Sequence, residues 1–121
     1  MAGETDFGAR RVYEMRLPAG AANGAFGRTI GGLLPPLGVL LVPEPAQHGG
    51  SDIQEIGADG APVVSLSQNG LDYFDIHHTA DDTLDKIDPK QLKQAVAIWS
   101  AFTYLAAMSD IDFRGLAATV K

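Results

Sequence analysis

Cysteine is absent from the 121 residues of this sequence. Disulfide bridges, thiolate zinc sites, iron–sulfur clusters and a cysteine nucleophile are therefore excluded, so any metal ion must be held by imidazole and carboxylate groups. Basic residues are also scarce, because nine Lys and Arg stand against fifteen Asp and Glu and the net charge is −6. A nucleic acid or an anionic membrane needs a basic partner surface, so we expect neither as a partner.

Long apolar runs are lacking as well. The longest, residues 30–42, is interrupted by three glycines and two prolines. It falls short of the roughly 20 residues that a membrane helix requires. The first eleven residues do not contain the apolar core of a signal peptide. We expect no segment to span a bilayer, and the sequence leaves the compartment open.

The composition is that of a globular protein, with 45% hydrophobic and 20% charged residues. A chain of this length has enough residues for one domain with one core. We therefore treat residues 1–121 as a single domain.

The first two thirds of the sequence are rich in glycine and proline. Residues 23–34 place apolar side chains at helical spacing and predict a short helix. The apolar runs 38–42 and 61–66 predict strands that are buried on both faces. Residues 51–56 between them predict a helical turn with Ser51 as its N-cap. Strand, helix and strand in this order favour a parallel crossover unit.

A long helix is predicted near the end of the chain. Asp88 is a suitable N-cap and Pro89 fits the first helical position. Apolar residues then recur at spacings of three and four up to Ala106, which is typical of a helix that packs on a sheet. The fold class is therefore α/β, with a mostly parallel sheet of three or four strands flanked by helices and a long C-terminal helix.

Polar chemistry concentrates in residues 72–83, where His77 and His78 lie among four carboxylates directly after a predicted strand. Loops at the carboxyl ends of parallel strands are where open α/β sheets place their sites. Neighbouring residues of an extended segment point to opposite sides, so we expect one imidazole to be a ligand and the other a support. The alternative is a solvated acidic turn that the two histidines only stabilise.

Two further segments are candidates. Asp6 is expected at the end of a short N-terminal strand, with Gly8 allowing a turn beyond it, although an Asp before a glycine is usually a turn residue. Residues 49–52 approach a helix N-terminus, where backbone N–H groups can bind an anion but capping by Ser51 is the simpler interpretation. His48 is expected to be exposed in its loop.

Taken in order, three segments resemble the C-terminal part of the di-zinc exopeptidases of clan MH, family M28, which include zinc aminopeptidases and the plasma glutamate carboxypeptidase branch. They are GETDFGA, GGSDIQEIGADGAPVVSL and YFDIHHTADDTLDKIDPKQL, at residues 3–9, 49–66 and 73–92. The third is the most specific, because the family commonly has His-Thr-x-x-Asp-Thr-Leu followed by Asp-Pro at the start of its last helix. The resemblance covers most of the chain, and residues 10–47 match least.

This resemblance implies roles for individual residues. His78 corresponds to the family's last zinc ligand and Asp6 to a carboxylate ligand at a strand end, and the two serve different metal ions. Asp82 would help to orient the His78 loop. Tyr73, Phe74 and His77 would line or support the cleft.

The family also has upstream residues that this chain does not contain, namely a His ligand, a bridging Asp and adjacent glutamates that include the general base. No Glu-Glu pair occurs in the sequence. Since a hydrolytic zinc ion needs about three protein ligands, we expect no catalysis by the chain alone and weak or absent zinc binding.

Three interpretations follow from the incomplete ligand set. The chain is a non-catalytic remnant or oligomeric interaction module, one half of a split enzyme, or a fragment of an active aminopeptidase or carboxypeptidase. Each leaves sheet edges and helix faces exposed, so we expect either a homo-oligomer or a separate N-terminal half as partner. The oligomer would form by strand addition or through the helix that carries Trp99 and Phe102.

Overall fold

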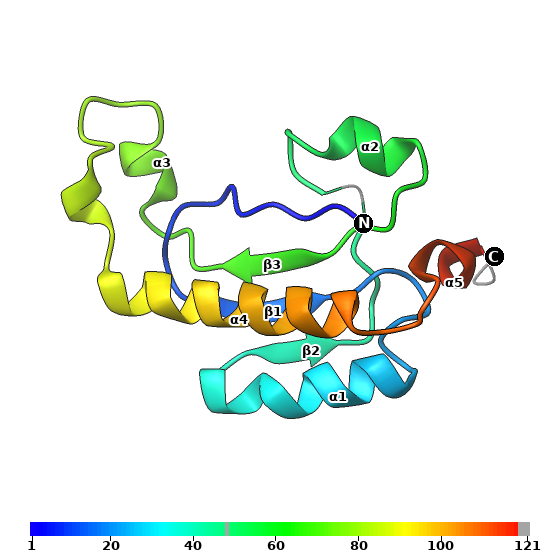
Figure 1. Cartoon of the computed structure of the whole chain (residues 1–121). Coiled ribbons are helices and arrows are strands. Elements are labelled where there is room, and N and C mark those ends of the chain that lie inside the picture. Colours follow the sequence, from blue (N-terminus) through cyan, green and yellow to red (C-terminus); the bar gives the residue numbers. More distant parts are fainter. Residues whose placement is uncertain (48, 119–121) are drawn as a thin grey trace.

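The computed structural model describes residues 1–47 and 49–118 and shows three short strands and several helices around one hydrophobic core (Figure 1). The elements in chain order are β1 Val12–Arg16, α1 Ala25–Leu33, η1 Pro35–Leu37, β2 Leu40–Val42, α2 Gln54–Ala58, β3 Ser65–Gln68, α3 Tyr73–Ile76, η2 Leu84–Lys86, α4 Pro89–Ala107 and α5 Phe113–Ala118.

The sheet is mixed, with β1 in its centre. The strand order is β2-β1-β3, and β1 pairs in parallel with β2 and in an antiparallel manner with β3. Met15 of β1 lies opposite both Leu41 and Leu66. The α/β class is therefore correct, whereas the prediction of a mostly parallel sheet is wrong.

The predicted parallel crossover is also wrong. β2 and β3 do not pair with each other, because β1 lies between them and they run in opposite directions. The two apolar runs follow one another in the sequence and so suggest neighbouring strands. The strand that lies between them in the sheet, β1, precedes both of them in the chain.

The central strand β1 was missed in the sequence because a bulge interrupts its alternation. Its register with β3 shifts between Val12 and Glu14, so the two side chains that are fully buried are Val12 and Met15, three residues apart. A strand with regular pleating would bury residues two apart. Glu14 lies on the polar face, where it accepts hydrogen bonds from Arg16 Nε at 2.7 Å and from Ser67 Oγ at 3.1 Å.

The two predicted strands are present with altered bounds and burial. β2 begins only at Leu40, because Gly38 takes a left-handed conformation with φ 71°. β3 begins at Ser65 and buries alternate residues, and Leu40 is 68% exposed. Neither strand is buried on both faces, because helices pack against only one side of the sheet.

Helices α1 and α4 form that covering layer. Ile30 of α1 and Ile98 and Phe102 of α4 join the buried residues of β1 and β3 in one core cluster. The helix predicted at residues 23–34 is confirmed as α1. The cap of the long helix is also confirmed, because Asp88 Oδ1 accepts a hydrogen bond from Lys90 N at 2.8 Å. A further helix, α5, follows α4, so the long helix is not the last element.

The N-terminal residues and α2 depart from expectation. Residues near Asp6 do not form a strand, since the segment has a single parallel bridge from Ala2 to Val63. Helix α2 begins at Gln54 and has Ile53, without a capping side chain, at its N-cap position. Ser51 is therefore not the cap.

Side-chain amides of α4 hold the first residue of β1. Val12 N donates to Gln94 Oε1 at 3.0 Å, and Gln94 Nε2 donates to Val12 O at 2.9 Å and to Leu37 O at 2.7 Å. Arg11 N donates to Gln91 Oε1 at 2.5 Å. These contacts join residues about eighty positions apart and fix α4 across the start of the central strand.

Within the part of the chain that the structure describes, no helix is both long and apolar enough to cross a membrane.

Replacing Gln94 with leucine tests this arrangement. Gln94→Leu leaves the N–H and C=O of Val12 and the C=O of Leu37 without these partners, and we expect the free energy of unfolding to fall by about 3 kcal/mol. Urea denaturation measures the change. Gln54→Leu, at an exposed position of α2, is the matched control and should change stability by less than about 0.5 kcal/mol. Equal effects of the two substitutions would contradict the role assigned to Gln94.

Candidate metal and substrate site

Helix α3 carries the candidate site and is anchored to the start of β1. Arg10 Nε donates to Asp72 Oδ1 at 3.1 Å, and Arg10 Nη2 also pairs with Asp72 Oδ2, so the guanidinium binds the carboxylate at two points. Such bidentate pairs fix both distance and orientation. The hydrogen bond from Arg10 lowers the pKa of the Asp72 carboxyl below its ordinary value. Asp72 directly precedes Tyr73, the first residue of α3.

Four aromatic rings then form a continuous stack that ends at the two histidines. Phe7 stacks on Tyr73 with ring centroids 4.4 Å apart, and Tyr73 stacks on His77 at 4.5 Å. His77 stacks in turn on His78 at 3.7 Å, with 22° between the ring planes. We call Phe7, Tyr73, His77 and His78 the ring stack. Phe74 meets three of these rings at steep angles, between 79° and 83°.

The two imidazoles lie on the same side of the chain, so the expectation that they point to opposite sides is wrong. His77 ends α3, and His78 has φ 57°, a left-handed conformation that is uncommon for a residue with a side chain. Thr79 holds this turn, because its backbone N and its Oγ1 both donate to Ile76 O, at 3.0 and 2.7 Å. Rings at successive positions alternate only in an extended segment, which this is not.

Asp82 closes the same turn. Its backbone N donates to Thr79 O at 3.2 Å, and Asp82 lines the same hollow as Phe7 and Tyr73. Partial burial raises the pKa of the Tyr73 phenol, and the negative charges of Asp6 and Asp82 raise it further.

Asp6 lies in the N-terminal segment next to Phe7. Its Oδ2 accepts a hydrogen bond from Ser51 Oγ at 3.3 Å, and the turn after it contains Gly8 with φ 79°. The N–H of Asp52 donates to Glu4 Oε2 at 3.2 Å. Residues 49–52 therefore face carboxylates, which argues against the anion-binding interpretation of this loop. His48 lies outside the described residues.

Two contacts with glycine position this N-terminal segment. A Cβ atom on Gly70 would lie 1.9 Å from the Phe7 ring, and one on Gly3 would lie 2.7 Å from the Trp99 ring. The Trp99 indole N–H also donates to Thr5 Oγ1 at 2.7 Å. The N-terminal segment is thus held before Asp6 by Trp99 packed on Gly3 and after Asp6 by Phe7 packed on Gly70.

Asp6 and His78 do not by themselves fit a zinc ion. The residues that the structure describes contain no group of three or more His, Asp or Glu side chains that could hold a metal, and no ion pair or hydrogen bond among them joins Asp6 to His78. A zinc site needs three or four ligands. We therefore derive no catalytic step through zinc for this chain.

Sequence reasoning missed the residues that position the site. Phe7 and Asp72 lie in the two candidate segments without a predicted role, and Arg10 is not predicted as a site residue although it belongs to the one pair of adjacent basic residues in the sequence. Asp72 lies 62 residues from Arg10, and nothing in the sequence links the two residues.

A solved relative has the same fold. It is described as a peptidase M28 precursor from Shewanella amazonensis, is 40% identical, and matches 90% of this chain with a TM-score of 0.76. The resemblance to the M28 peptidases is confirmed. The chain covers only 24% of that relative.

Curated relatives agree with this result. Carboxypeptidase Q from Homo sapiens is 38% identical over 76 residues, and that from Bos taurus is 36% identical over 75 residues. Each match takes in 62% of this chain and 16% of the relative. No protein-family profile matches the chain. The chain is thus similar to one segment of these longer proteins.

The Arg10–Asp72 pair makes the anchoring of α3 dependent on pH. Because the folded-state pKa of Asp72 is lowered, its contribution to stability is present above about pH 4 and is lost as pH falls through the lowered value. Asp72→Asn should therefore destabilise the protein at neutral pH, and its difference from the wild type should shrink on acidification.

Urea titrations at a series of pH values measure this difference. Asp75→Asn is the control, since Asp75 is an exposed carboxylate of the same helix and forms none of the ion pairs found among the described residues. A difference between Asp72→Asn and wild type that is the same at all pH values would contradict the pair.

Proposed function

We propose that this chain is the part of a zinc exopeptidase catalytic unit that supplies one imidazole ligand, His78, and one carboxylate ligand, Asp6, and that it is not catalytic alone. The observation that carries the proposal is the conformation of His78. Its strained left-handed backbone is held by Thr79 while its ring is stacked on His77. Backbone strain of this kind persists where surrounding contacts impose it, and it is concentrated at functional sites.

The similarity to proteins named carboxypeptidase Q and peptidase M28 supports a metallopeptidase-like segment. In the resembling family the two ligands serve different metal ions of one pair. Ions of such a pair lie roughly 3.5–4 Å apart and need shared ligands, which this chain would obtain from the rest of a catalytic unit.

The remaining residues of the ring stack have supporting roles in this proposal. His77 fixes the plane of the His78 ring by stacking, and Tyr73 and Phe7 continue that support toward Asp6. Asp82 stabilises the turn through its hydrogen bond to Thr79. Phe74 is 76% exposed and offers an apolar wall to a substrate side chain.

Two alternatives belong to the same proposal. In the first, the chain is one half of a split or truncated aminopeptidase or carboxypeptidase, and a second polypeptide supplies the general base. In the second, it is an interaction module that has lost the chemistry. The first requires that Asp6 and His78 still function when the other ligands are provided.

The isolated chain should not hydrolyse peptides. It contains no Glu-Glu pair, and the described residues contain no closed metal site, so aminoacyl and dipeptide substrates should remain intact in the presence of zinc. Turnover that a chelator and His78→Ala both abolish would contradict this expectation.

Zinc should also stabilise the isolated chain only weakly. Two donors give much less binding energy than the roughly 10–16 kcal/mol of structural zinc sites, so micromolar zinc should cause no large saturating shift in melting temperature. Differential scanning calorimetry with zinc and with chelator measures the shift. A large shift that His78→Ala removes would show that further ligands are present.

A chimera tests the proposed ligands directly. Residues 1–118 replace the matching segment of the Shewanella amazonensis relative, which covers 90% of this chain. If Asp6 and His78 are ligands, the chimera should hydrolyse the peptides that the relative hydrolyses, and Asp6→Ala or His78→Ala should lower kcat/KM by at least about a hundredfold.

His77→Phe is the matched control for the chimera, because it retains a stacking ring and should leave activity close to that of the parent chimera. If the His78→Ala chimera were as active as the parent chimera, His78 would not be a metal ligand. A folded chimera without activity would favour the interaction module.

A further inference from the structure

Both asparagines of the chain are followed by a glycine, as Asn23–Gly24 and Asn69–Gly70. Asparagine is chemically labile in this dipeptide, because the backbone nitrogen of the next residue can attack the side-chain amide carbon. A glycine in second place has no side chain to hinder the attack and the widest choice of backbone angles. The two dipeptides lie in different surroundings, so the structure distinguishes the rates at which they should react.

The side chain of Asn69 is folded toward the nitrogen that would attack it. Asn69 is exposed and directly follows β3, and Leu71 N donates to Asn69 Oδ1 at 3.1 Å. In such an Asx turn the side-chain amide lies back over the next residue, which brings Asn69 Cγ toward Gly70 N. The hydrogen bond also stabilises the negative charge that develops on Oδ1 during attack, as the donors of an oxyanion hole do. No hydrogen bond among the described residues uses Gly70 N as its donor, so none has to break first.

Asn23 has neither advantage. Among the described residues, no hydrogen bond reaches its side chain. Gly24 is the N-cap of α1, and its carbonyl oxygen accepts a hydrogen bond from Arg28 N at 3.1 Å. The backbone of Ala22 packs so closely on α1 that a Cβ on Gly27 would lie 1.9 Å from Ala22 O. Helix α1 therefore fixes the backbone on both sides of Asn23 and opposes the rotation that attack requires.

We infer that Asn69 is a site of spontaneous modification, at which the Asn69–Gly70 dipeptide cyclises and reopens as aspartate or isoaspartate. Gly70 N loses its proton to solvent and forms a bond to Asn69 Cγ, the Cγ–Nδ2 bond breaks, and Nδ2 leaves as ammonia. Water then opens the succinimide ring at either carbonyl. One opening gives aspartate, and the other gives isoaspartate, in which the main chain runs through Cβ and Cγ. The reaction consumes one water, releases one ammonia and needs no other reactant.

Isoaspartate at this position separates two anchored parts of the chain. Asn69 N donates to Arg11 O at 3.0 Å, whereas Gly70 packs on the Phe7 ring and its carbonyl oxygen accepts from Tyr73 N at 3.1 Å. Isoaspartate lengthens the main chain between these anchors by one C–C bond, about 1.5 Å. A Cβ on Gly70 would already lie 1.9 Å from the Phe7 ring, so there is no room for Gly70 to shift toward it. We expect Phe7 to lose its place on Gly70.

The modification would act on the candidate site through Phe7. Phe7 begins the ring stack and directly follows Asp6, whereas His78 is held separately by the turn at Thr79. Release of Phe7 would therefore free Asp6 and leave His78 in its turn. In a catalytic unit, ageing at Asn69 would separate the two candidate ligands. This last consequence rests on the proposed function, and the modification itself does not.

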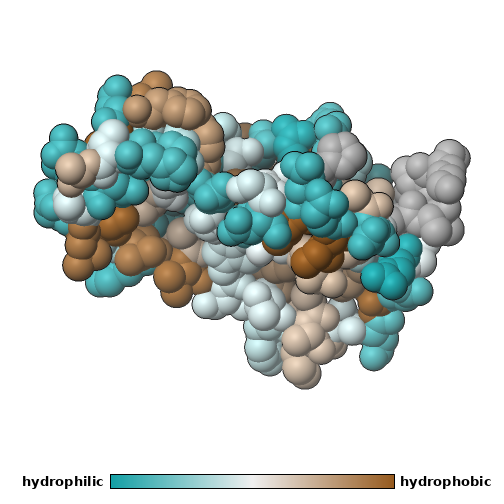
Figure 2. All heavy atoms as spheres, turned by 90° about the horizontal axis from the view of Figure 1, so that it is seen from above, coloured by the Kyte–Doolittle hydropathy of each residue, from teal (hydrophilic) through white to brown (hydrophobic). Residues whose placement is uncertain are grey.

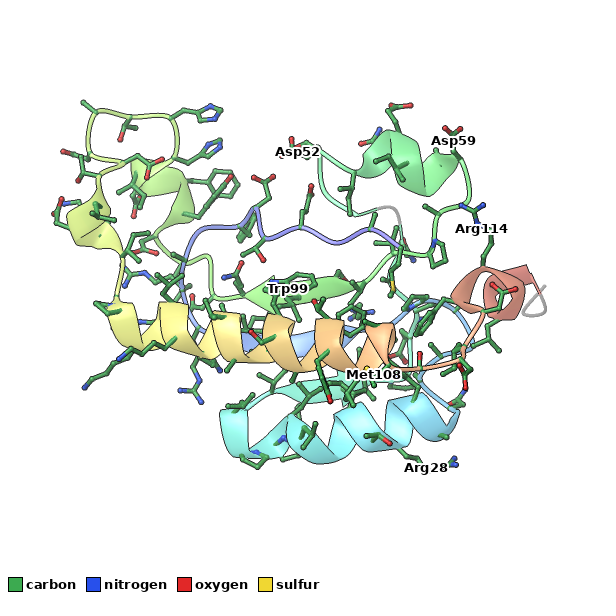
Figure 3. The ribbon with its side chains drawn as sticks, in the orientation of Figure 1. Arg28, Asp52, Asp59, Trp99, Met108 and Arg114 are labelled. Carbon is green, nitrogen blue, oxygen red and sulfur yellow. The ribbon has the colours of Figure 1, made fainter. Side chains whose placement is uncertain are left out.

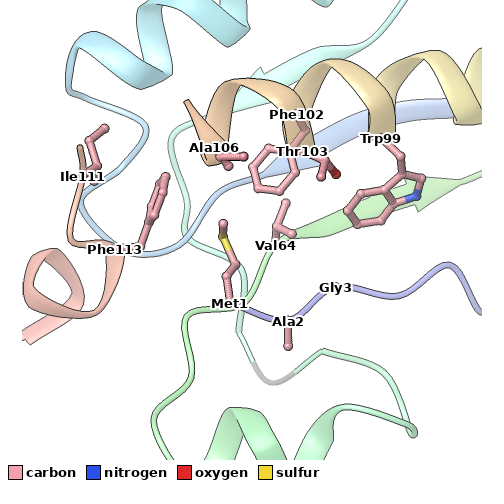
Figure 4. Close-up of a pocket in the computed structure, with 11 residues that line it drawn as sticks. Met1, Ala2, Gly3, Val64, Trp99, Phe102, Thr103, Ala106, Ile111 and Phe113 are labelled. Atoms are coloured by element: carbon pink, nitrogen blue, oxygen red, sulfur yellow. The ribbon is translucent and has the colours of Figure 1, made fainter. Parts of the chain in front are cut away.

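Two other regions of the surface do not show what they bind. Hydrophobic side chains gather at the end of the molecule that carries α3 (Figure 2), and they include Leu71 at 91% and Leu84 at 86% exposure. An open hollow of about 480 Å³ lies at the C-terminal end of α4, with Trp99 and Ala106 on one side and Met1 near the other (Figure 4). Nothing among the described residues identifies a partner for either region.

Ageing of the folded chain at mildly alkaline pH tests the site. Peptide mass spectrometry follows the exchange of NH₂ for OH at each asparagine, and electron-transfer fragmentation distinguishes isoaspartate from aspartate. Asn69 should react about fivefold faster than Asn23 in the folded protein, and the two rates should agree within about twofold in urea. The inference is wrong if Asn69 reacts no faster than Asn23 in the folded protein, or if the same difference persists in urea.

Leu71→Pro tests the activating hydrogen bond, because it removes the N–H that donates to Asn69 Oδ1. Leu71 is the second residue of the turn that Tyr73 N closes on Gly70 O, a position that favours proline, and its side chain is exposed. The reaction of Asn69 should slow about fivefold. Leu71→Ala keeps the N–H and is the matched control, and circular dichroism verifies that both variants fold. An unchanged rate in Leu71→Pro would overturn the assignment of Asn69 as a site activated by the fold.

Limited proteolysis tests the displacement of Phe7. Ion exchange isolates the aged protein, which carries one more negative charge, and chymotrypsin should release residues 1–7 from its isoaspartate form about fivefold faster than from the unmodified chain. Asn69→Asp is the matched control, because it has the same added charge with a main chain of normal length, and it should be cut at the wild-type rate.

Equal cutting of the isoaspartate form and the unmodified chain would show that Phe7 keeps its place and would contradict the predicted displacement. Fast cutting of Asn69→Asp would contradict it as well, since charge and not chain length would then be the cause. These measurements need neither zinc nor peptidase activity, so their failure is distinct from failure of the proposed function.

Discussion

The hydrogen bonds between the Gln94 amide and the backbone of Val12 are the constraint on which the rest of the structure depends. They join α4 to the first residue of the central strand, and that strand carries both sheet pairings. Immediately before it, Arg10 binds Asp72 and so positions α3. The position of the ring stack, and with it His78, follows from this chain of contacts. A partly buried polar contact at the edge of the core therefore helps to determine where the candidate site lies.

The parts of the fold that could be predicted are those with a strong local signal. Helix α4 has a capping residue, a proline at its first position and a long apolar period, and all three are visible in the sequence. Strand β1 has none of these, because its bulge changes the spacing of the buried residues and places Glu14 and Arg16 on the other face. Strand direction was mispredicted for a related reason, since the sheet order depends on a strand that was not recognised.

In the candidate site, too, the residues within one short motif could be predicted, whereas the contacts between distant residues could not. His78, Asp82 and the neighbouring aromatic residues could be proposed from one segment, because a short motif contains them all. Their spatial arrangement could not, since the left-handed backbone at His78 has no sequence signal, and Asp72 and Tyr73 contact Arg10 and Phe7, which lie far away in the sequence. Figure 3 shows Trp99 beside the N-terminal segment although nearly the whole chain separates them.

This separation has a consequence for the order of folding. The hydrogen bond from Trp99 to Thr5 joins residues 94 positions apart, and the contact between Gly70 and Phe7 closes another long loop. The loss of chain entropy in closing such loops is offset only after the intervening elements have formed. We therefore expect the N-terminal segment with Asp6 to dock last, on a surface that α4 and the turn at Gly70 have already built. The two candidate ligands would then acquire their relative position at the final step of folding, and slow or incomplete docking would leave His78 in place without Asp6.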